Sequence, residues 1–193
     1  MKDGNRLKEK ANKKPEMLLH VCCANCVLHP INTLKDRFNI TLYFYNPNIH
    51  PEEEYKKRLE DIKRISKIEE LPLIIDRYDT ECWFGLTDPY KDEPEGSGRC
   101  EVCFSMRMEK TAETASAGNF DIIATTLSVS PHKNSESINK TGEEAAKKHD
   151  IAFYIANFKK KNGFRKTTEM GKKYAIYRQD YCGCIYSMRN NAT

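Results

Sequence analysis

Short apolar runs alternate with longer amphipathic segments along this chain. The apolar runs have the length of buried strands and lie at residues 17–23, 39–46, 71–76, 121–131 and 151–157. Segments with helical spacing of apolar residues separate them, at residues 27–38, 51–67, 100–119 and 135–150. This alternation predicts βαβ units, and therefore an α/β fold with a Rossmann-like, mostly parallel five-stranded sheet and helices on both faces.

The segment 51–67 has the clearest helical pattern. It begins at Pro51, has three acids in its first turn, and places Tyr55, Leu59, Ile62 and Ile65 on one face. Residues 80–99, in contrast, combine Pro, Gly and acids without periodicity and predict a long loop. The helix predicted at 27–38 has Pro30 near its first turn.

The ends of the chain differ from the middle. Residues 1–16 are basic and lack apolar periodicity, so we expect a flexible tail followed by a single catalytic domain at 17–193. The C-terminal part predicts a helical, cysteine-containing segment. No apolar run is long enough to span a bilayer, and no secretory signal core precedes the first strand. We therefore expect a cytoplasmic protein without membrane contact, in which disulfides are rare.

Seven of the eight cysteines form three spaced motifs: Cys22-Cys23-x-x-Cys26, Cys100-x-x-Cys103 and Cys182-Gly-Cys184. The first motif follows the first predicted strand, and residues 46–50 and 128–132 follow two others, so we expect these groups on one rim of the sheet. Adjacent residues on an extended backbone point to opposite sides, which would let Cys22 and Cys23 serve two neighbouring metals. Cys82 stands alone and is expected to be a small buried apolar residue.

The spacing leaves the chemistry open among zinc, an iron–sulfur centre and a redox dithiol. Seven thiols exceed the four of a closed zinc site, so either one site is incomplete and reactive or two centres share the ligands. A thioredoxin-like dithiol would leave two of the three motifs unexplained.

Charge is distributed unevenly. Residues 159–178 contain eight Lys or Arg and one Glu, a net +7, so the remainder of the chain carries −3. This pattern suggests a polyanionic partner such as RNA, and its alternative is a solvated helix face.

Several motifs together carry a family resemblance: "LLHVCCANC", "YNPNIHPEEEYKKR", "GRCEVCFSMRM", "TTLSVSP" and "YRQDYCGCIYS". In this order they closely resemble the cobalamin-independent epoxyqueuosine reductase family QueH, over residues 18–187. A departure is Asn25, where relatives often have proline. The resemblance implies a HUP-like fold and an oxygen-sensitive enzyme that reduces the epoxide of epoxyqueuosine to queuosine, at the wobble position of tRNAs with a GUN anticodon. It also implies a 4Fe-4S cluster beside an additional iron or zinc, no cobalamin, and an electron donor of unknown identity.

Carried onto this chain, the resemblance implies site residues. The cluster and metal ligands would be Cys22, Cys23, Cys100, Cys103, Cys182 and Cys184, with Cys26 as a further metal candidate. The reaction also needs proton donors, and the candidates that lie in or beside the motifs are His50, Asp180, Tyr181 and Tyr186. The uneven charge adds the expectation that the anticodon arm contacts Lys159, Lys160, Lys161, Arg165, Lys166, Lys172 and Lys173, and that Phe158 or Phe164 stacks on a base.

Two rival hypotheses remain. A tRNA thiolation enzyme would need a glycine-rich phosphate loop after the first strand, where this chain has "CCANCVLHP". A zinc-stabilised RNA-binding module would bind zinc without a visible chromophore.

Overall fold

A computed structural model describes residues 13–188, and most of the predicted tail lies outside this range. Its five strands form one parallel sheet in the order β3-β2-β1-β4-β5. The strands are β1 (Glu16–His20), β2 (Asn39–Phe44), β3 (Leu73–Ile75), β4 (Ile122–Thr125) and β5 (Ala152–Phe153). The predicted fold class is confirmed.

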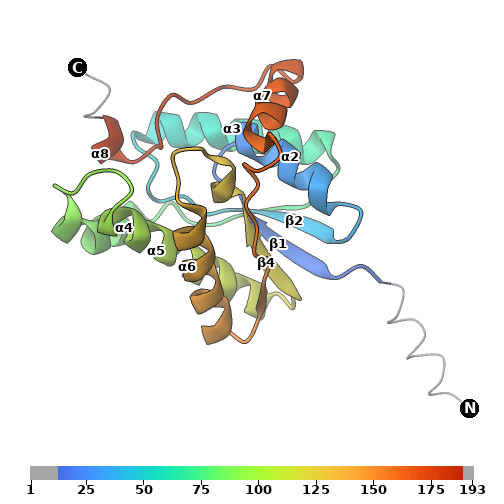
Figure 1. The fold of residues 1–193 in the computed structure, drawn as a ribbon, viewed down its shortest axis with the longest axis horizontal. Helices are drawn as coiled ribbons and strands as arrows, with labels where there is room; N and C mark the ends of the chain where they lie inside the picture. The colour runs from blue at the N-terminus through green and yellow to red at the C-terminus, as the bar shows by residue number, and fades with distance from the viewer. Residues whose placement is uncertain (1–12, 189–193) are drawn as a thin grey trace, which may run out of the picture.

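Helices cover both faces of the sheet. They are α2 (Ala24–Leu34), α3 (Glu52–Ile68), α4 (Thr80–Thr87), α5 (Gly98–Ala117), α6 (Ser135–Lys148), α7 (Gly163–Lys173) and α8 (Ile185–Met188), with 3-10 turns η1 (Asp88–Tyr90) and η2 (Thr126–Val129). Figure 1 shows α2, α3 and α7 on one side of the sheet and α5 and α6 on the other. Within residues 13–188, no helix is long and apolar enough to cross a membrane.

The central strand β1 is buried on both faces. Met17 and Leu19 pack into the apolar core beneath α2 and α3, while Leu18 packs into the core on the α5 and α6 side. Alternate side chains of a strand point to opposite faces, so a strand with helices on both sides needs apolar residues at every position. Each such side chain contributes roughly 1.5–3 kcal/mol of burial free energy, which fixes the strand that leads into the first cysteines.

The first helix begins earlier than predicted. It starts at Ala24 instead of residue 27, with Cys23 as its extended N-cap, so Cys26 lies in its first turn. Pro30 therefore lies inside the helix and not near its start. The pattern failed here because cysteine and asparagine gave no apolar signal, although Cys26 is buried.

The predicted loop at 80–99 is wrong in its first half, where α4 and η1 form. Asp79 caps α4 by accepting a hydrogen bond from the Cys82 backbone N–H at 3.4 Å. Trp83 and Thr87 are its buried residues. Eight residues with so narrow a buried stripe give little periodicity, so the sequence pattern missed this helix.

Candidate metal and active site

Cys22, Cys23 and Cys26 form the N-terminal sulfur group. Their three sulfurs all lie within 4.8 Å of one another, and the sulfurs of Cys22 and Cys23 are 3.8 Å apart. The expectation that Cys22 and Cys23 face opposite sides is therefore wrong, because the chain bends at Cys22 and enters α2 directly after Cys23. Gln179 covers the group and donates a hydrogen bond from Nε2 to Cys23 Sγ at 2.8 Å.

Hydrogen bonds among these thiols separate their pKa values. Those from Cys23 and Cys26 hold the pKa of Cys22 well below its usual range. The hydrogen bond with Cys22 raises the pKa of Cys23 to about 12. Hydrogen bonds with Cys22 and Cys23 raise the pKa of Cys26. The three sulfurs therefore favour one shared negative charge, and a soft cation that displaces the remaining protons can bind all three.

Cys100, Cys103, Cys182 and Cys184 form the C-terminal sulfur group. They line one narrow hollow beside Trp83 and Phe104. Cys100 and Cys103 come from the first turns of α5, and Cys182 and Cys184 from an irregular segment before α8. Burial raises the pKa of Cys103, and burial raises that of Cys184 to about 12, so protonated thiols are favoured until a metal replaces the protons.

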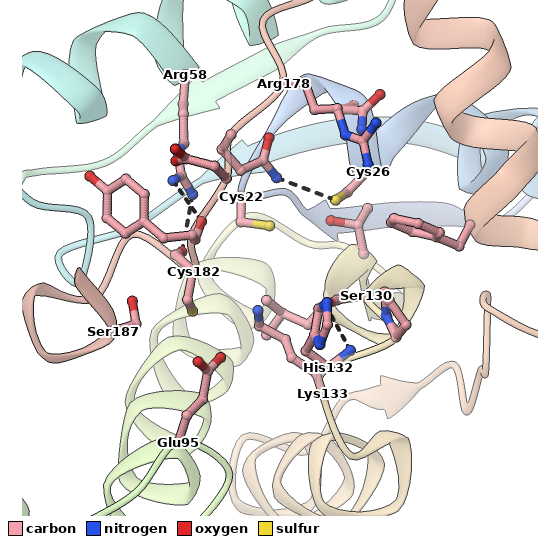
Figure 2. Close-up of a pocket in the computed structure, with 18 residues that line it drawn as sticks. Cys22, Cys26, Arg58, Glu95, Ser130, His132, Lys133, Arg178, Cys182 and Ser187 are labelled. Carbon is pink, nitrogen blue, oxygen red and sulfur yellow. Dashed lines mark hydrogen bonds between the residues drawn. The ribbon is translucent and has the colours of Figure 1, made fainter. Parts of the chain in front are cut away.

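A central pocket of about 520 Å³ lies beside both sulfur groups. Cys22, Cys26 and Thr126 line it at the carboxyl ends of β1 and β4, where α/β sheets commonly bind ligands. Four residues line both this pocket and the hollow of the C-terminal sulfur group: Glu95, His132, Lys133 and Cys182. Figure 2 shows Cys22 and Cys26 on one side of the pocket, with Cys182 and Lys133 entering from other segments.

Two cations lie near the sulfurs, the buried Arg107 and the half-buried Lys133. Arg107 is 1 % exposed and donates from Nη2 to Asn46 Oδ1 at 2.7 Å. Burial disfavours the charged amine of Lys133, but the charges of Cys182 and Cys22 outweigh it and raise its pKa. Among residues 13–188, neither cation has a carboxylate partner. A buried charge requires compensation, and Cys22, whose pKa lies well below its usual range, supplies negative charge here.

Another buried cation, Arg58 of α3, holds the segment that carries Tyr181 and Cys182 in place. Its Nη1 and Nη2 atoms donate to the carbonyls of Cys182 at 3.0 Å and Tyr181 at 3.1 Å, while Nε donates to Glu54 Oε1 at 2.7 Å. The Tyr177 hydroxyl donates to Glu54 Oε2 at 2.9 Å. This arrangement, the Arg58 clamp, fixes where the Cys182 sulfur enters the pocket.

The three proposed proton donors lie in different surroundings. Asp180 and Tyr181 line the central pocket, and burial raises the pKa of Tyr181 to about 12. His50 does not line it. The His50 ring packs on Phe84 and Trp83, with ring centroids 4.8 and 5.2 Å away, and burial lowers its pKa. His50 instead contributes its backbone, because its N–H donates to the Gly183 carbonyl at 2.8 Å and its carbonyl accepts from the Tyr181 hydroxyl.

The seven cations expected to contact RNA do not line the central pocket, although Arg178 and Phe164 do. Phe158 is buried. Cys82 is exposed, so the prediction that it is a buried apolar residue is wrong.

Sequence patterns missed Arg58, Arg107, Lys133 and Gln179 as site residues. Arg58 and Arg107 lie within α3 and α5, where the apolar pattern predicts buried apolar residues but does not indicate which charged residues are also buried. Lys133 left a usable signal, since it directly follows the "SVSPH" stretch after the fourth strand. Gln179 lies within the quoted "YRQDYCGCIYS" motif, but its role was missed because it depends on contact with cysteines more than 150 positions away.

Together, these features define a Rossmann-like α/β protein with a cysteine cluster that could hold a metal at the carboxyl edge of its sheet. The family model for epoxyqueuosine reductase QueH matches residues 17–190, and the chain belongs to this family. The chain is 38 % identical over 187 residues to the QueH of Streptococcus pyogenes, covering 94 % of this chain and 73 % of that protein. It is 37 % identical over 175 residues to the QueH of Thermotoga maritima, covering 89 % and 90 %.

A solved structure supports the fold assignment. A protein described as a predicted subunit of tRNA methyltransferase from Methanocaldococcus jannaschii aligns with a TM-score of 0.52 at 18 % identity. The alignment covers 79 % of this chain and 75 % of that one. At this identity the likeness concerns the fold alone.

Proposed function

We propose that this protein is an epoxyqueuosine reductase, an oxidoreductase that converts epoxyqueuosine in tRNA to queuosine in the last step of queuosine biosynthesis. The observation that carries this proposal is the arrangement of seven cysteines in two groups beside the central pocket, which share Cys182 as a lining residue of both cavities, in a chain of the QueH family. The substrate would be tRNA with a GUN anticodon. The reaction also needs an electron donor, whose identity is open, and takes place in the reducing cytoplasm.

The thiol set suits a 4Fe-4S cluster with an additional iron or zinc. Thiolates are the usual ligands of such clusters and bind zinc and iron well. The N-terminal and C-terminal sulfur groups together supply the ligands, and Cys182 lies where the two groups meet. When bound, the cluster would supply single electrons, and the additional metal would supply a Lewis acid for the epoxide oxygen.

Removing the epoxide oxygen consumes two electrons and two protons and releases water. The residues of the chain bind and orient the base in the central pocket, and Phe164 at its wall offers a ring for stacking. Lys133 holds a positive charge near Cys22 and Cys182, where it stabilises negative charge that develops on oxygen. Asp180 lines the same pocket and is a carboxyl group placed to pass on a proton, as is Glu95.

The test begins with anaerobic purification and measurement of iron, sulfide and zinc per chain. We expect roughly four irons and four sulfides with one further metal, and an absorbance that bleaches on reduction. The protein should then convert epoxyqueuosine in a synthetic anticodon stem-loop to queuosine, as measured by mass spectrometry of the nucleosides.

Two matched variants sharpen this test. Cys22→Ser should lose metal and turnover, whereas Cys82→Ser, at an exposed cysteine outside the site, should keep both. Zinc without sulfide or chromophore, even after cluster reconstitution, would contradict the proposal and favour a zinc-stabilised RNA-binding protein.

A further inference from the structure

A second hollow, of about 580 Å³, is lined by residues of α2, the segment that follows β5, and the first turns of α6 and α7. We call it the lysine hollow; its walls include Ser135, Glu136, Ile155, Lys160, Lys161 and Lys166. We propose that the lysine hollow binds the phosphodiester backbone of a nucleotide next to the one whose base enters the central pocket. This inference rests on the proposed tRNA substrate and concerns how that RNA is held.

The charges of the lysine hollow favour an anion. Lys160, Lys161 and Lys166 are exposed, and within residues 13–188 none of them forms a salt bridge. Glu136 is the acid on the wall, and it has no salt bridge in the same range. The excess of positive charge is therefore available to a ligand, and phosphate groups of RNA match it.

The remaining walls suit a nucleotide better than a free ion. Ile155 is 61 % exposed although it is a large apolar residue, so it offers a contact surface for a sugar or base. Ser135 and Glu136 begin the 14-residue helix α6, whose N-terminal end favours negative charge. An apolar contact beside an anion site fits an RNA backbone, whose sugars alternate with phosphates.

The structure connects the two cavities through shared segments. Phe164 of α7 lines the central pocket while Lys166, two residues later, lines the lysine hollow. Residues two apart on a helix point in widely different directions, so the first turn of α7 separates the cavities. Lys159, next to Lys160 of the lysine hollow, joins the two cavity walls, because its Nζ donates at 2.6 Å to the carbonyl of Lys133, a residue of the central pocket. An RNA strand with one base in the central pocket can thus place a neighbouring phosphate in the lysine hollow.

The backbone of the lysine hollow has an unusual conformation at Lys161 and Asn162. Lys161 and Asn162 are consecutive non-glycine residues with positive φ, at 52° and 62°. Gly163 has no room for a side chain, since a Cβ there would lie 1.7 Å from the Phe158 carbonyl oxygen. Strained backbone of this kind persists where the surrounding structure requires it, and it often occurs at ligand sites.

The proposal narrows the seven cations expected to contact RNA, because Arg165, Lys172 and Lys173 have different surroundings and are not part of the proposed subsite. Arg165 donates to Glu169 at 2.8 Å, and Lys172 and Lys173 lie in the last turn of α7, where positive charge stabilises the helix end. None of these three lines either cavity. They provide a matched control with the same loss of charge at another place on the same segment.

The test measures binding of a synthetic anticodon stem-loop over a range of salt concentrations. For Lys160→Gln/Lys161→Gln/Lys166→Gln we expect the slope of log affinity against log salt to fall by about two units. The control Arg165→Gln/Lys172→Gln/Lys173→Gln should keep the slope of the unaltered protein. Metal content should stay the same in both, and in turnover the first variant should raise KM while kcat is kept. An equal loss of slope in both variants, or no loss in the first, would overturn the proposal.

A second measurement locates the phosphate. Single neutral methylphosphonate linkages on either side of the target nucleotide should weaken binding to the unaltered protein at one or two positions. At those positions the triple variant should show no further loss, because the contact is already absent. Additive losses at every position would contradict a defined subsite. Because these measurements use binding of RNA, they stand apart from turnover: lysine-dependent binding without epoxide reduction would refute the proposed function and leave the subsite supported.

Discussion

The two sulfur groups are positioned by different kinds of structure. The N-terminal group is contained within five residues, at the junction of a buried central strand and the first turn of α2. The C-terminal group combines the start of α5 with an irregular segment almost 80 residues later in the chain. Regular structure therefore places the first group, while side-chain hydrogen bonds from other elements must place half of the second.

This difference predicts unequal sensitivity to mutation. The backbone hydrogen bonds of β1 and α2 are part of the sheet and helix, so no single side chain controls the N-terminal group. The segment that carries Cys182 depends instead on the Arg58 clamp and on Gly183. Local opening is easiest where few regular hydrogen bonds hold the chain. We therefore expect substitutions around this segment to affect metal binding most.

The largest effect should come from Arg58→Leu. Arg58 and Glu54 have side chains only 2 % and 7 % exposed, so loss of the arginine leaves a buried carboxylate without its partner. Removing one member of a buried pair costs about 3–5 kcal/mol. We expect a loss of this size in the free energy of unfolding, measured by anaerobic denaturant titration, together with fewer metal ions per chain.

Two further variants separate positioning from general damage. Arg58→Lys keeps the charge but cannot donate to both carbonyls and Glu54 in the same fork, so it should recover stability more than metal content. Lys56→Leu, at an exposed lysine of the same helix, should behave like the unaltered protein. If Arg58→Leu kept its full metal content, the clamp would have no part in placing Cys182.

Gly183→Ala should have an intermediate effect. Gly183 has φ +102°, and a Cβ there would lie 3.0 Å from Ile49 and 3.1 Å from Arg58. A side chain in this conformation costs about 1–3 kcal/mol of strain. The metal content and the visible spectrum should change with it, because the substitution lies between Cys182 and Cys184.

Gly85→Ala is the matched control. Gly85 lies in α4, and a Cβ there would have no neighbour within 4 Å. Alanine favours a helix by about 0.5–1 kcal/mol over glycine, so this variant should be as stable as the unaltered protein or slightly more stable. Equal losses in the two variants would mean that the strain at Gly183 is not what holds the segment.

The difference between positions set by regular structure and positions set by distant side-chain contacts explains how much of the fold and the site the sequence could predict. Strands, the main helices and the cysteine motifs follow from local patterns, and the predicted apolar face of α3 packs into the core, with Tyr55, Ile62 and Ile65 buried and Leu59 partly buried. The rim location of Cys22 and Cys26 followed from their place directly after a strand of a parallel sheet. Arg58 and Gln179 could not be found in this way, because their partners lie more than 100 residues away and leave no periodic signal.

The smallest effect should come from the side of the N-terminal sulfur group. Thr167 of α7 is fully buried, and its hydroxyl donates to the Asn25 carbonyl in the first turn of α2. Thr167→Val keeps the shape but leaves that carbonyl without its donor, which should cost about 1 kcal/mol. Thr168→Val is the control and should cost less, because the Thr168 hydroxyl donates to a carbonyl within α7 itself.

Metal content should stay unchanged in both variants, because β1 and α2 hold the three sulfurs through their own backbone hydrogen bonds. Loss of metal in Thr167→Val would show that the N-terminal group also depends on distant side chains, and the contrast between the two groups would no longer hold.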